Sequence, residues 1–445
     1  MNSRFPRLAA WLAYAQRLRS SPLFRGGAFS LLIQVQALPL QFLVAVVLAR
    51  HLGPVGFGIY SFVGAAIGLV QVMPLSGLDQ VVLRYTAQYC ATSDWARLRG
   101  LWRLAWRASL VYAVPTAALA LAFGLFGGAH GHGAISPPAI AASALLLLLL
   151  PTSTFYAAAL RGVHPGVLSQ VPGSVLRPWL FALFLAAALL LRPALLGPQA
   201  VLLLQGAAVA VVLLVTRNWL RRHRPPEVAQ APAQHDTAAW LRAVVPFALM
   251  GGLMLINVQA DLLLLGVLGG ARDAGIYRVA VQAASLVVLP LNAANLFIAK
   301  HVVTLHTHGD HRKLQRLLRL SARSTLLVAA LVALAIAVGA RWLIIPVLGA
   351  AYAGAYAPML VLCAAQLINV GFGSVGLVLN MTGGEGAAAR AAGVAAALNI
   401  ALNLLLIPRW GSLGAATATL LTMILWNGLM YLQVRRRLGV GTSIV

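Results

Sequence analysis

The chain has 445 residues, of which 61% are hydrophobic and only 9% are charged, and its formal net charge is +25. Soluble domains carry roughly 25% charged residues, so a water-soluble fold is excluded and the surplus of apolar side chains must face lipid. The positive charge does not indicate a nucleic-acid partner, because the arginines lie in short segments beside apolar stretches, where they pair with anionic lipid headgroups.

Residues 1–27 are rich in arginine and have no continuous apolar core before a cleavage site, so we expect a cytoplasmic interfacial segment rather than a signal peptide. Twelve apolar stretches follow, each close to the roughly 20 residues that span a bilayer as a helix. A backbone exposed to lipid must satisfy its own hydrogen bonds, so we predict an all-α polytopic membrane protein with about 12 transmembrane helices. The stretches are 28–49, 58–78, 105–126, 139–160, 174–191, 199–216, 243–268, 277–299, 324–345, 356–379, 391–407 and 413–433.

The distribution of basic residues predicts the orientation of the chain. With the N-terminus placed inside, 27 of the 33 Lys and Arg residues fall in cytoplasmic segments and only 6 in outer ones. This excess follows the positive-inside rule, so both termini are expected to be cytoplasmic.

The two halves of the chain resemble each other. "HLGPVGFGIY" at 51–60 is echoed by "LGGARDAGIY" at 268–277, and "SDWARLRGLWRLAWRASL" at 93–110 aligns with "GDHRKLQRLLRLSARSTL" at 309–326. The second alignment pairs Asp94 with Asp310, and a basic residue follows each aspartate by three positions. We interpret the glycine-rich phrase as the outer turn between the first two helices of each half, where glycine permits a tight turn and close helix approach.

The repeat predicts the domain organisation. Six spans per half is an even number, so the halves are parallel repeats related by an axis along the membrane normal. We expect an N-lobe at 28–216, a cytoplasmic linker at 217–242, a C-lobe at 243–433 and a cytoplasmic tail at 434–445. In such folds the substrate site lies between the lobes, and rocking of one lobe against the other gives alternating access.

Polar groups inside the predicted spans are costly in lipid and are therefore functional candidates. Arginines and lysines at span ends can instead extend to the headgroups, and glutamines can hold helices together. Asp261 lies four residues after Asn257, on the same helix face, and Asp79 is either a helix-end residue or a partner of Arg84. The candidates are Gln34, Gln36, Gln41, Asp79, Arg84, Arg177, Asn257, Asp261, Arg278 and Lys300.

The sequence lacks the features of an enzyme. Only one of the eight carboxylates, Asp273, falls in a predicted outer loop, whereas a glycosyltransferase or polymerase needs acids near its reaction centre. No P-loop, G-x-S-x-G or paired-cysteine motif is present, and we do not expect the clustered histidines, which lie in a glycine loop and a basic loop, to bind a metal. We therefore expect a transporter with no ATPase of its own, no catalytic residues, no metal and no cofactor.

The glycine-rich phrase and its surroundings resemble a known family. "LARHLGPVGFGIYSFVGAAIGLVQVMPLSGLDQVVLRYTAQ" at 48–88 is similar to the opening signature of bacterial polysaccharide and O-antigen flippases. "ADLLLLGVLGGARDAGIYRVA" at 260–280 and "LLIPRWGSLGAATATLL" at 405–421 agree with it. These flippases belong to the multidrug/oligosaccharidyl-lipid/polysaccharide exporter superfamily.

The resemblance implies a V-shaped, two-lobed transporter in the bacterial inner membrane. Its cargo would be an undecaprenyl-diphosphate-linked oligosaccharide, moved from the cytoplasmic to the outer leaflet by an ion gradient or the membrane potential. It would work as a monomer among membrane lipids, beside a polysaccharide polymerase and other assembly proteins. A diphosphate suits arginine, which binds phosphate bidentately.

The candidate residues then receive roles. Arg84, Arg177, Arg278 and Lys300 would bind the headgroup, Gln34, Gln41 and Asn257 would bind sugar hydroxyls, and Asp261 and Asp79 would couple transport to an ion.

Alternatives remain open. A multidrug cation exporter of the same superfamily needs an acidic, aromatic cavity, and a lipid II flippase usually has fourteen spans. A membrane polymerase or acyltransferase of the glycan pathway needs long outer loops with acids or histidines, whereas the outer loops here are short. A teichoic-acid or exopolysaccharide precursor is as compatible with the sequence as O-antigen.

Overall fold

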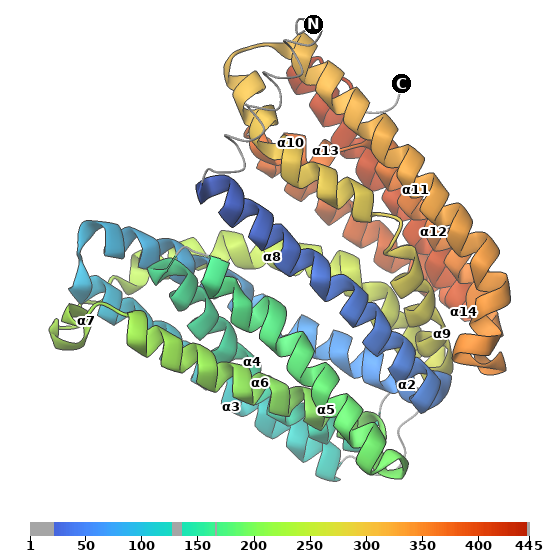
Figure 1. Cartoon of the computed structure of the whole chain (residues 1–445), viewed down its shortest axis with the longest axis horizontal. Coiled ribbons are helices and arrows are strands. Elements are labelled where there is room, and N and C mark those ends of the chain that lie inside the picture. The colour runs from blue at the N-terminus through green and yellow to red at the C-terminus, as the bar shows by residue number, and fades with distance from the viewer. Residues whose placement is uncertain (1–21, 127–135, 165–166, 443–445) are drawn as a thin grey trace, which may run out of the picture.

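A computed structural model describes residues 22–126, 136–164 and 167–442, without the side chains of 22–35, 37, 38, 72–76 and 250. Most of the predicted interfacial segment 1–27 and the end of the predicted tail therefore lie outside the described residues. Every regular element within these ranges is a helix (Figure 1). The main helices are α2 Pro22–Thr92, α3 Trp95–Phe126, α4 Pro137–Val163, α5 Arg177–Leu191, α6 Pro198–His223, α7 Glu227–Gln230, α8 Thr237–Leu268, α9 Gly270–Ala284, α10 Leu289–Thr307, α11 His311–Leu348, α12 Tyr356–Phe372, α13 Val375–Met381 and α14 Glu385–Leu438.

The helices have the length and composition of membrane spans, which confirms the predicted all-α membrane class. Nine helices of the described chain are long and apolar enough to cross a bilayer, or ten if the bent pair α9 and α10 is one span. α14 has 54 residues, or about 80 Å at 1.5 Å per residue, which is more than twice the thickness of a hydrocarbon core. It is interrupted at Gly411, and α2 is interrupted at Gly53. The number twelve and the lobe boundaries stay predictions.

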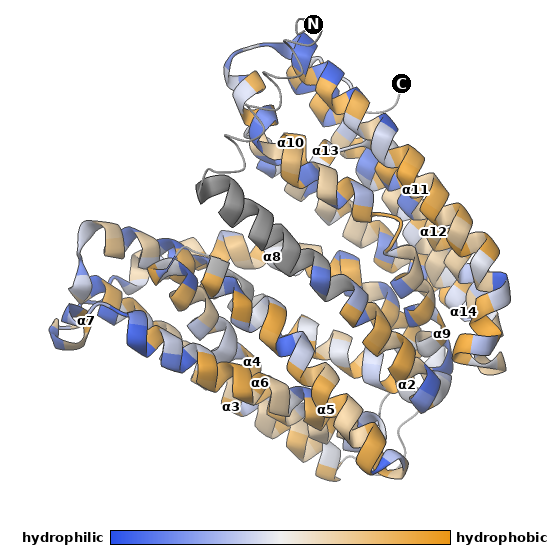
Figure 2. Ribbon diagram, in the orientation of Figure 1, coloured by the Kyte–Doolittle hydropathy of each residue, from blue (hydrophilic) through white to orange (hydrophobic). Residues whose placement is uncertain are grey.

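The outward faces of the helices are apolar. Figure 2 shows hydrophobic residues along the outside of α3, α5 and α11, with hydrophilic residues gathered toward the helix ends. Leu119 is 70% exposed and Leu327 is 65% exposed. Side chains of this kind lose hydrophobic stabilisation when they face water, so these faces are suited to contact with lipid.

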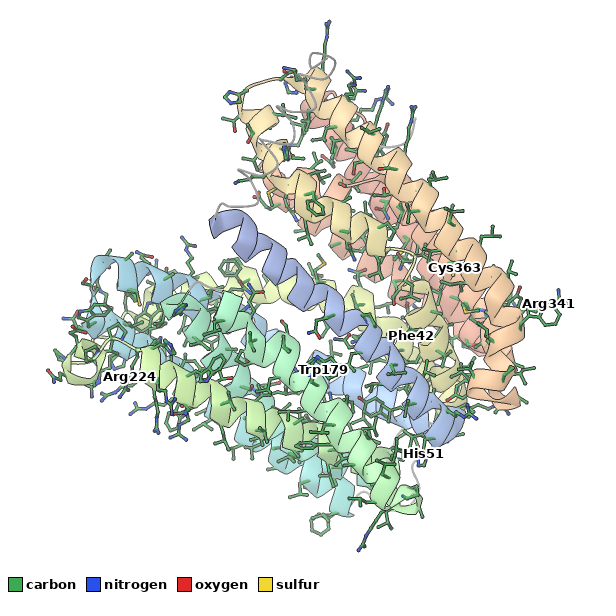
Figure 3. All side chains as sticks on the ribbon, viewed as in Figure 1. Phe42, His51, Trp179, Arg224, Arg341 and Cys363 are labelled. Carbon is green, nitrogen blue, oxygen red and sulfur yellow. The ribbon has the colours of Figure 1, made fainter. Side chains whose placement is uncertain are left out.

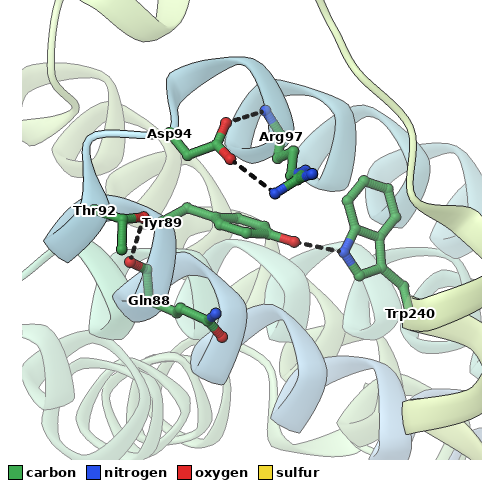
Figure 4. Close-up of polar contacts among 6 residues, drawn as sticks. All are labelled: Gln88, Tyr89, Thr92, Asp94, Arg97 and Trp240. Carbon is green, nitrogen blue, oxygen red and sulfur yellow. Dashed lines mark hydrogen bonds and ion pairs between the residues drawn. The ribbon is translucent and has the colours of Figure 1, made fainter.

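Two groups of helices approach each other at one end and diverge toward the other (Figure 1). The helices α3 to α6 form one group and α10 to α14 form the other, with α2, α8 and α9 where the groups meet. α8 contacts both groups. Near its start, the buried Trp240 packs with Leu98 and Leu101 of α3 and donates a 3.0 Å hydrogen bond to the hydroxyl of Tyr89 (Figure 4). Farther along, Asn257 Nδ2 donates to the carbonyl oxygen of Ala392 in α14 at 3.1 Å.

The aspartates aligned by the repeat begin their helices in the same way. The backbone N–H of Arg97 donates to Asp94 Oδ1 and that of Lys313 to Asp310 Oδ1, each at 3.1 Å (Figure 4 shows the first). Each aspartate also forms an ion pair with the same basic residue, at 3.3 Å and 2.7 Å respectively. Hydrogen bonds from Lys313 hold the pKa of Asp310 below its ordinary value. The shared capping geometry supports the internal repeat.

Candidate functional site

A cavity of about 1300 Å³ lies between the two groups of helices. Its walls come from α2, α5, α6, α9, α10 and α11. Most small-molecule sites have volumes of roughly 300–1,000 Å³, so this cavity has room for a larger ligand. The polar residues that line it are Gln41, Tyr60, Ser174, Arg177, Gln205, Arg278, Gln282, Asn292 and Asn295.

Two arginines from different helices make the cavity basic. Arg177 begins α5 directly after the short π-helical segment Pro172–Leu176, and Arg278 lies on α9. Local π-helical turns are frequent at functional sites because they redirect the side chains that follow. Tyr60 of α2 lines the same cavity. None of the described lining residues is Asp or Glu. Half-buried positive charges without a carboxylate are costly, and an anionic ligand between them removes that cost.

Amide side chains line the rest of the polar surface. Gln41, a predicted sugar-binding residue, is exposed and lines the cavity. A sugar-binding side chain must be accessible in this way. The hydroxyl of Tyr60 donates to Gln205 Oε1 at 3.3 Å, which joins α2 to α6. Asn295 Oδ1 is buried without a hydrogen-bond partner among the described residues. Amides both donate and accept hydrogen bonds, so this surface suits sugar hydroxyls.

One predicted polar residue has a packing role. Gln36 Oε1 accepts a 2.7 Å hydrogen bond from the indole of Trp179, which Figure 3 shows on α5. The amide nitrogen of Gln36 donates to the carbonyl oxygen of Ser174 at 3.3 Å. This side chain therefore holds α2 to the wall that carries Arg177.

Several predicted site residues lie away from the cavity lining. Arg84 and Lys300 are exposed, and the Arg84 guanidinium lies 5.8 Å from the ring centroid of Tyr85. Asn257 donates to backbone carbonyls of α8 and α14 and so joins helices. Gln34 belongs to the part of α2 whose side chains lie outside the described residues.

Asp79 does not pair with Arg84. Its Oδ2 accepts from Gln80 at 3.5 Å, and its Oδ1 is buried with no partner among the described residues. Arg161 is close enough to act on Asp79 electrostatically, and its Nε is also buried and without a hydrogen-bond partner among the described residues. No ion pair joins these two side chains within the described residues.

The structure surrounds Asp261 with hydrogen-bond donors from α9 and α14. Asp261 is only 5% exposed. Its Oδ1 accepts from Asn403 Nδ2 at 2.6 Å, and its Oδ2 accepts from the hydroxyls of Tyr277 at 2.9 Å and Thr419 at 2.5 Å. Asn399 Oδ1 completes the group by accepting from Asn403 Nδ2 at 3.1 Å. We call these five residues the Asp261 cluster.

The Asp261 cluster has no cationic side chain. Burial of a charge is costly unless the charge is both paired and hydrogen-bonded, and Asp261 is hydrogen-bonded but forms no ion pair with a described residue. Asn403 Oδ1 is buried and has no hydrogen-bond partner among the described residues, so the cluster offers a free acceptor beside the carboxylate. No group of three or more His, Cys, Asp or Glu side chains in the described chain could hold a metal ion. The cluster therefore suits a proton or a monovalent cation held by oxygen atoms.

Two repeat-related glycines close one end of the cavity. A Cβ atom on Gly58 would lie 1.7 Å from the carbonyl oxygen of Ala271, and one on Gly275 would lie 2.0 Å from that of Pro54. Nearby, the hydroxyl of Tyr352 donates to the carbonyl oxygen of Ala49 at 2.9 Å. We call this region the closed end. The predicted close helix approach at the glycine-rich phrases is confirmed, and Gly53 and Gly270 beside it adopt positive φ angles of 66° and 86°.

Substitution of Gly58 by alanine is expected to destabilise the closed end. Overpacked contacts cost about 1–3 kcal/mol, so the population of states with this end closed should fall by roughly fivefold to hundredfold. The measurement is the rate at which Gln41→Cys is labelled by a membrane-impermeant thiol reagent added on the side of the closed end. Gly64→Ala is the matched control on the same helix, because no atom lies within 4 Å of its Cβ position. Equal labelling of both variants would contradict the role of Gly58.

The fold is similar to that of known membrane transporters. The structure matches the inward-facing conformation of a multidrug resistance MATE family transporter of the MOP superfamily with a TM-score of 0.68 and 14% identity, covering 93% of this chain and 98% of that one. It matches the lipid II flippase MurJ in an inward closed conformation with a TM-score of 0.66 and 13% identity, covering 91% and 87% of the two chains. A further match is a MOP superfamily transporter from Pyrococcus furiosus whose binding pocket is described as having reverse polarity, with a TM-score of 0.62, 13% identity and coverage of 95% and 97%. At these identities the likeness shows the fold.

The sequence places the chain more narrowly. The chain belongs to the polysaccharide biosynthesis protein family, whose family model matches residues 23–300. No curated protein matches it significantly. The predicted family is thereby confirmed, and the structural matches show that the chain has the fold of transporters from the predicted superfamily.

Proposed function

We propose that this protein flips a polyprenyl-diphosphate-linked oligosaccharide across the bacterial inner membrane, from the cytoplasmic to the outer leaflet. The observation that carries the proposal is the large cavity with Arg177 and Arg278 on its walls and no carboxylate among its described lining residues. The polysaccharide biosynthesis family supports a glycan cargo. A likeness to the lipid II flippase MurJ supports movement of a lipid-linked substrate.

The chemistry of the cavity favours this cargo over a cationic drug. Arg177 and Arg278 present planar guanidinium groups that bind phosphate oxygens bidentately. The amides of Gln41, Gln205 and Gln282 supply donors and acceptors for sugar hydroxyls. A cationic drug would be repelled by both arginines and would find no lining carboxylate to bind.

The same lining disfavours a polymerase or acyltransferase. Glycosyl and acyl transfer need a base, a nucleophile or a metal at the reaction centre. The described lining residues include no Asp, Glu, His, Cys or Lys that could hold a metal, act as a base or activate the hydroxyls of Ser174 and Tyr60. The cavity is built to bind and release its ligand, which is the task of a transporter.

The Asp261 cluster is our candidate for coupling transport to a proton or sodium ion. Tyr277 donates to Asp261, and the next residue on α9 is Arg278 in the cavity wall. A change in the charge at Asp261 therefore acts on the helix turn that carries a headgroup-binding residue. Asp79, which lies near Arg161, is the second candidate for ion coupling.

The closed end predicts the direction of movement. By the positive-inside rule the end with Gly58 and Gly275 faces outward, so the described state receives cargo from the cytoplasm. The headgroup enters between the arginines while the polyprenyl tail stays in lipid through the gap between the lobes. Separation of the closed end then releases the headgroup to the outer leaflet, where a polymerase and other assembly proteins receive it from the monomeric flippase.

The deciding experiment is the leaflet position of the lipid-linked oligosaccharide in cells that lack this protein. We expect it to accumulate on the cytoplasmic side and to return to the outer leaflet when the intact gene is restored. Lipid-linked units that reach the outer leaflet but stay unpolymerised would instead show that the protein is a membrane enzyme of the glycan pathway. Normal glycan together with lost resistance to toxic cations would establish the drug exporter.

A further inference from the structure

A second pocket, of about 410 Å³, lies at the opposite end of the first helix group from the closed end. It shares no lining residue with the large cavity. Figure 3 shows Arg224 there, where α6 ends beside α7. We call it the arginine pocket. It is lined by Arg99, Trp102, Arg103, Trp106, Phe155, Tyr156, Leu220, Arg221, Arg224, Val228 and Ala229.

The charge of the arginine pocket is not neutralised by the described residues around it. Arg99 Nη1 donates to the carbonyl oxygen of Ala231 at 2.5 Å, which fixes this side chain against the linker. Arg103, Arg221 and Arg224 are exposed and pair with no described carboxylate. Glu227 begins α7 nearby but is not among the lining residues. Four guanidinium groups around one hollow create a strong preference for a multiply charged anion.

The walls of the arginine pocket are aromatic. The indole of Trp102 donates to the hydroxyl of Thr86 at 3.0 Å, which holds that ring in place as part of the wall. Trp106 is 42% exposed, and Phe155 and Tyr156 of α4 line the same hollow. Tryptophan and tyrosine gather at the level of lipid headgroups, where one side of the ring is wet and the other is apolar.

An exposed apolar strip leads away from the arginine pocket along α3. Val114 and Leu121 follow Arg103 by 11 and 18 residues, which places all three on the same face of the helix. The side chains of Val114 and Leu121 are 53% and 46% exposed, respectively. At 1.5 Å per residue, Val114 lies about 16 Å from Arg103 along the axis, close to half the thickness of a hydrocarbon core. A ligand seated on the arginines can therefore extend an acyl chain along this strip within one leaflet.

We propose that the arginine pocket binds an anionic glycerophospholipid of the cytoplasmic leaflet. Its phosphate would lie among Arg99, Arg103, Arg221 and Arg224, its glycerol region against Trp102 and Trp106, and an acyl chain along Val114 and Leu121. A soluble phosphate would use only the charges and would leave the aromatic wall and the apolar strip without a role. The lipid would hold α3, α4 and α6 to the linker between the two halves.

The test compares lipid binding to the purified full-length protein by native mass spectrometry. Phosphatidylglycerol should bind at least tenfold more tightly than phosphatidylcholine. The variant Arg103→Ala/Arg221→Ala/Arg224→Ala should bind phosphatidylglycerol about hundredfold more weakly, since each arginine at a membrane surface contributes roughly fivefold. The matched control is Arg312→Ala/Arg316→Ala/Arg319→Ala, which removes three exposed arginines from the repeat-related helix α11 and should bind as the unaltered protein does.

Three results would overturn the proposal. One is equal binding of the two lipids by the unaltered protein, which needs no variant and so does not depend on folding. Another is an equal loss of binding in the control, which would mean that surface charge acts without a defined pocket. The third is full displacement of the lipid by glycerol 3-phosphate at the same concentration, which would identify a site for soluble phosphate. If the triple variant unfolds at a lower temperature without lipid, Arg221→Ala alone should still weaken binding about fivefold.

Discussion

Replacement of both Arg177 and Arg278 by alanine is expected to slow flipping by at least hundredfold. A hydrogen bond to a charged group contributes about 1.5–3 kcal/mol, so each arginine should account for roughly tenfold to hundredfold. The measurement is the rate at which a labelled polyprenyl-diphosphate oligosaccharide crosses the bilayer of proteoliposomes. Lysine in both positions should restore part of the rate, because it keeps the charge but loses the bidentate geometry.

The arginine variants can be separated from unfolding. Removal of two half-buried charges that pair with no described carboxylate should not lower the unfolding temperature, because their desolvation cost is also removed. Arg84→Ala and Arg341→Ala are the controls, since both residues are exposed and neither lines the cavity. Figure 3 shows Arg341 at the far end of α11. A rate loss in these controls equal to that of the cavity variants would assign the effect to overall charge and reject the headgroup site.

Asp261→Asn is expected to abolish the dependence of flipping on an ion gradient while membrane insertion stays intact. Asparagine has the shape of the carboxyl side chain and keeps an oxygen that can accept from Tyr277 and Thr419, but it carries no charge that a proton or cation could neutralise. The measurement is the ratio of flipping rates with and without an imposed proton or sodium gradient. An unchanged ratio would remove Asp261 from the mechanism.

Two further variants sharpen this test. Asp79→Asn distinguishes the two coupling candidates, because only the residue that carries the ion should change the gradient dependence. Tyr277→Phe keeps the charge of Asp261 and removes one hydrogen bond, worth about 1 kcal/mol, so its effect should be within roughly tenfold. A loss with Tyr277→Phe as large as with Asp261→Asn would mean that packing of α9, and not charge, controls transport.

Composition and periodicity were enough to predict much of the fold. An apolar content of 61% leaves few folds other than membrane helices, because each apolar stretch must satisfy its own backbone hydrogen bonds in lipid. The echo between the two glycine-rich phrases predicted a close helix approach, since a glycine has no Cβ to keep backbones apart. Gly58 and Gly275 meet neighbouring backbones there. The principle that polar groups inside predicted spans are functional candidates selected Arg177, Arg278 and Gln41, which line the cavity.

The selection of polar residues from the predicted spans did not include Gln205 and Gln282, although both lie inside predicted spans and line the cavity. It included Arg84 and Lys300, which the structure places outside the lining. The partners of Asp261 were likewise not foreseen, because Asn403 and Thr419 follow it by 142 and 158 residues.

The helical class and the presence of apolar spans were therefore determined by the sequence alone, whereas the boundaries of the helices and the direction in which each helix face points were decided only by tertiary packing. In a soluble protein, water distinguishes the outer face of a helix from the inner one. Here lipid and protein interior are equally apolar, so both faces carry the same residues. Only the packing of helices distant in sequence shows which polar side chains meet in a cavity, which join helices and which extend to the headgroups.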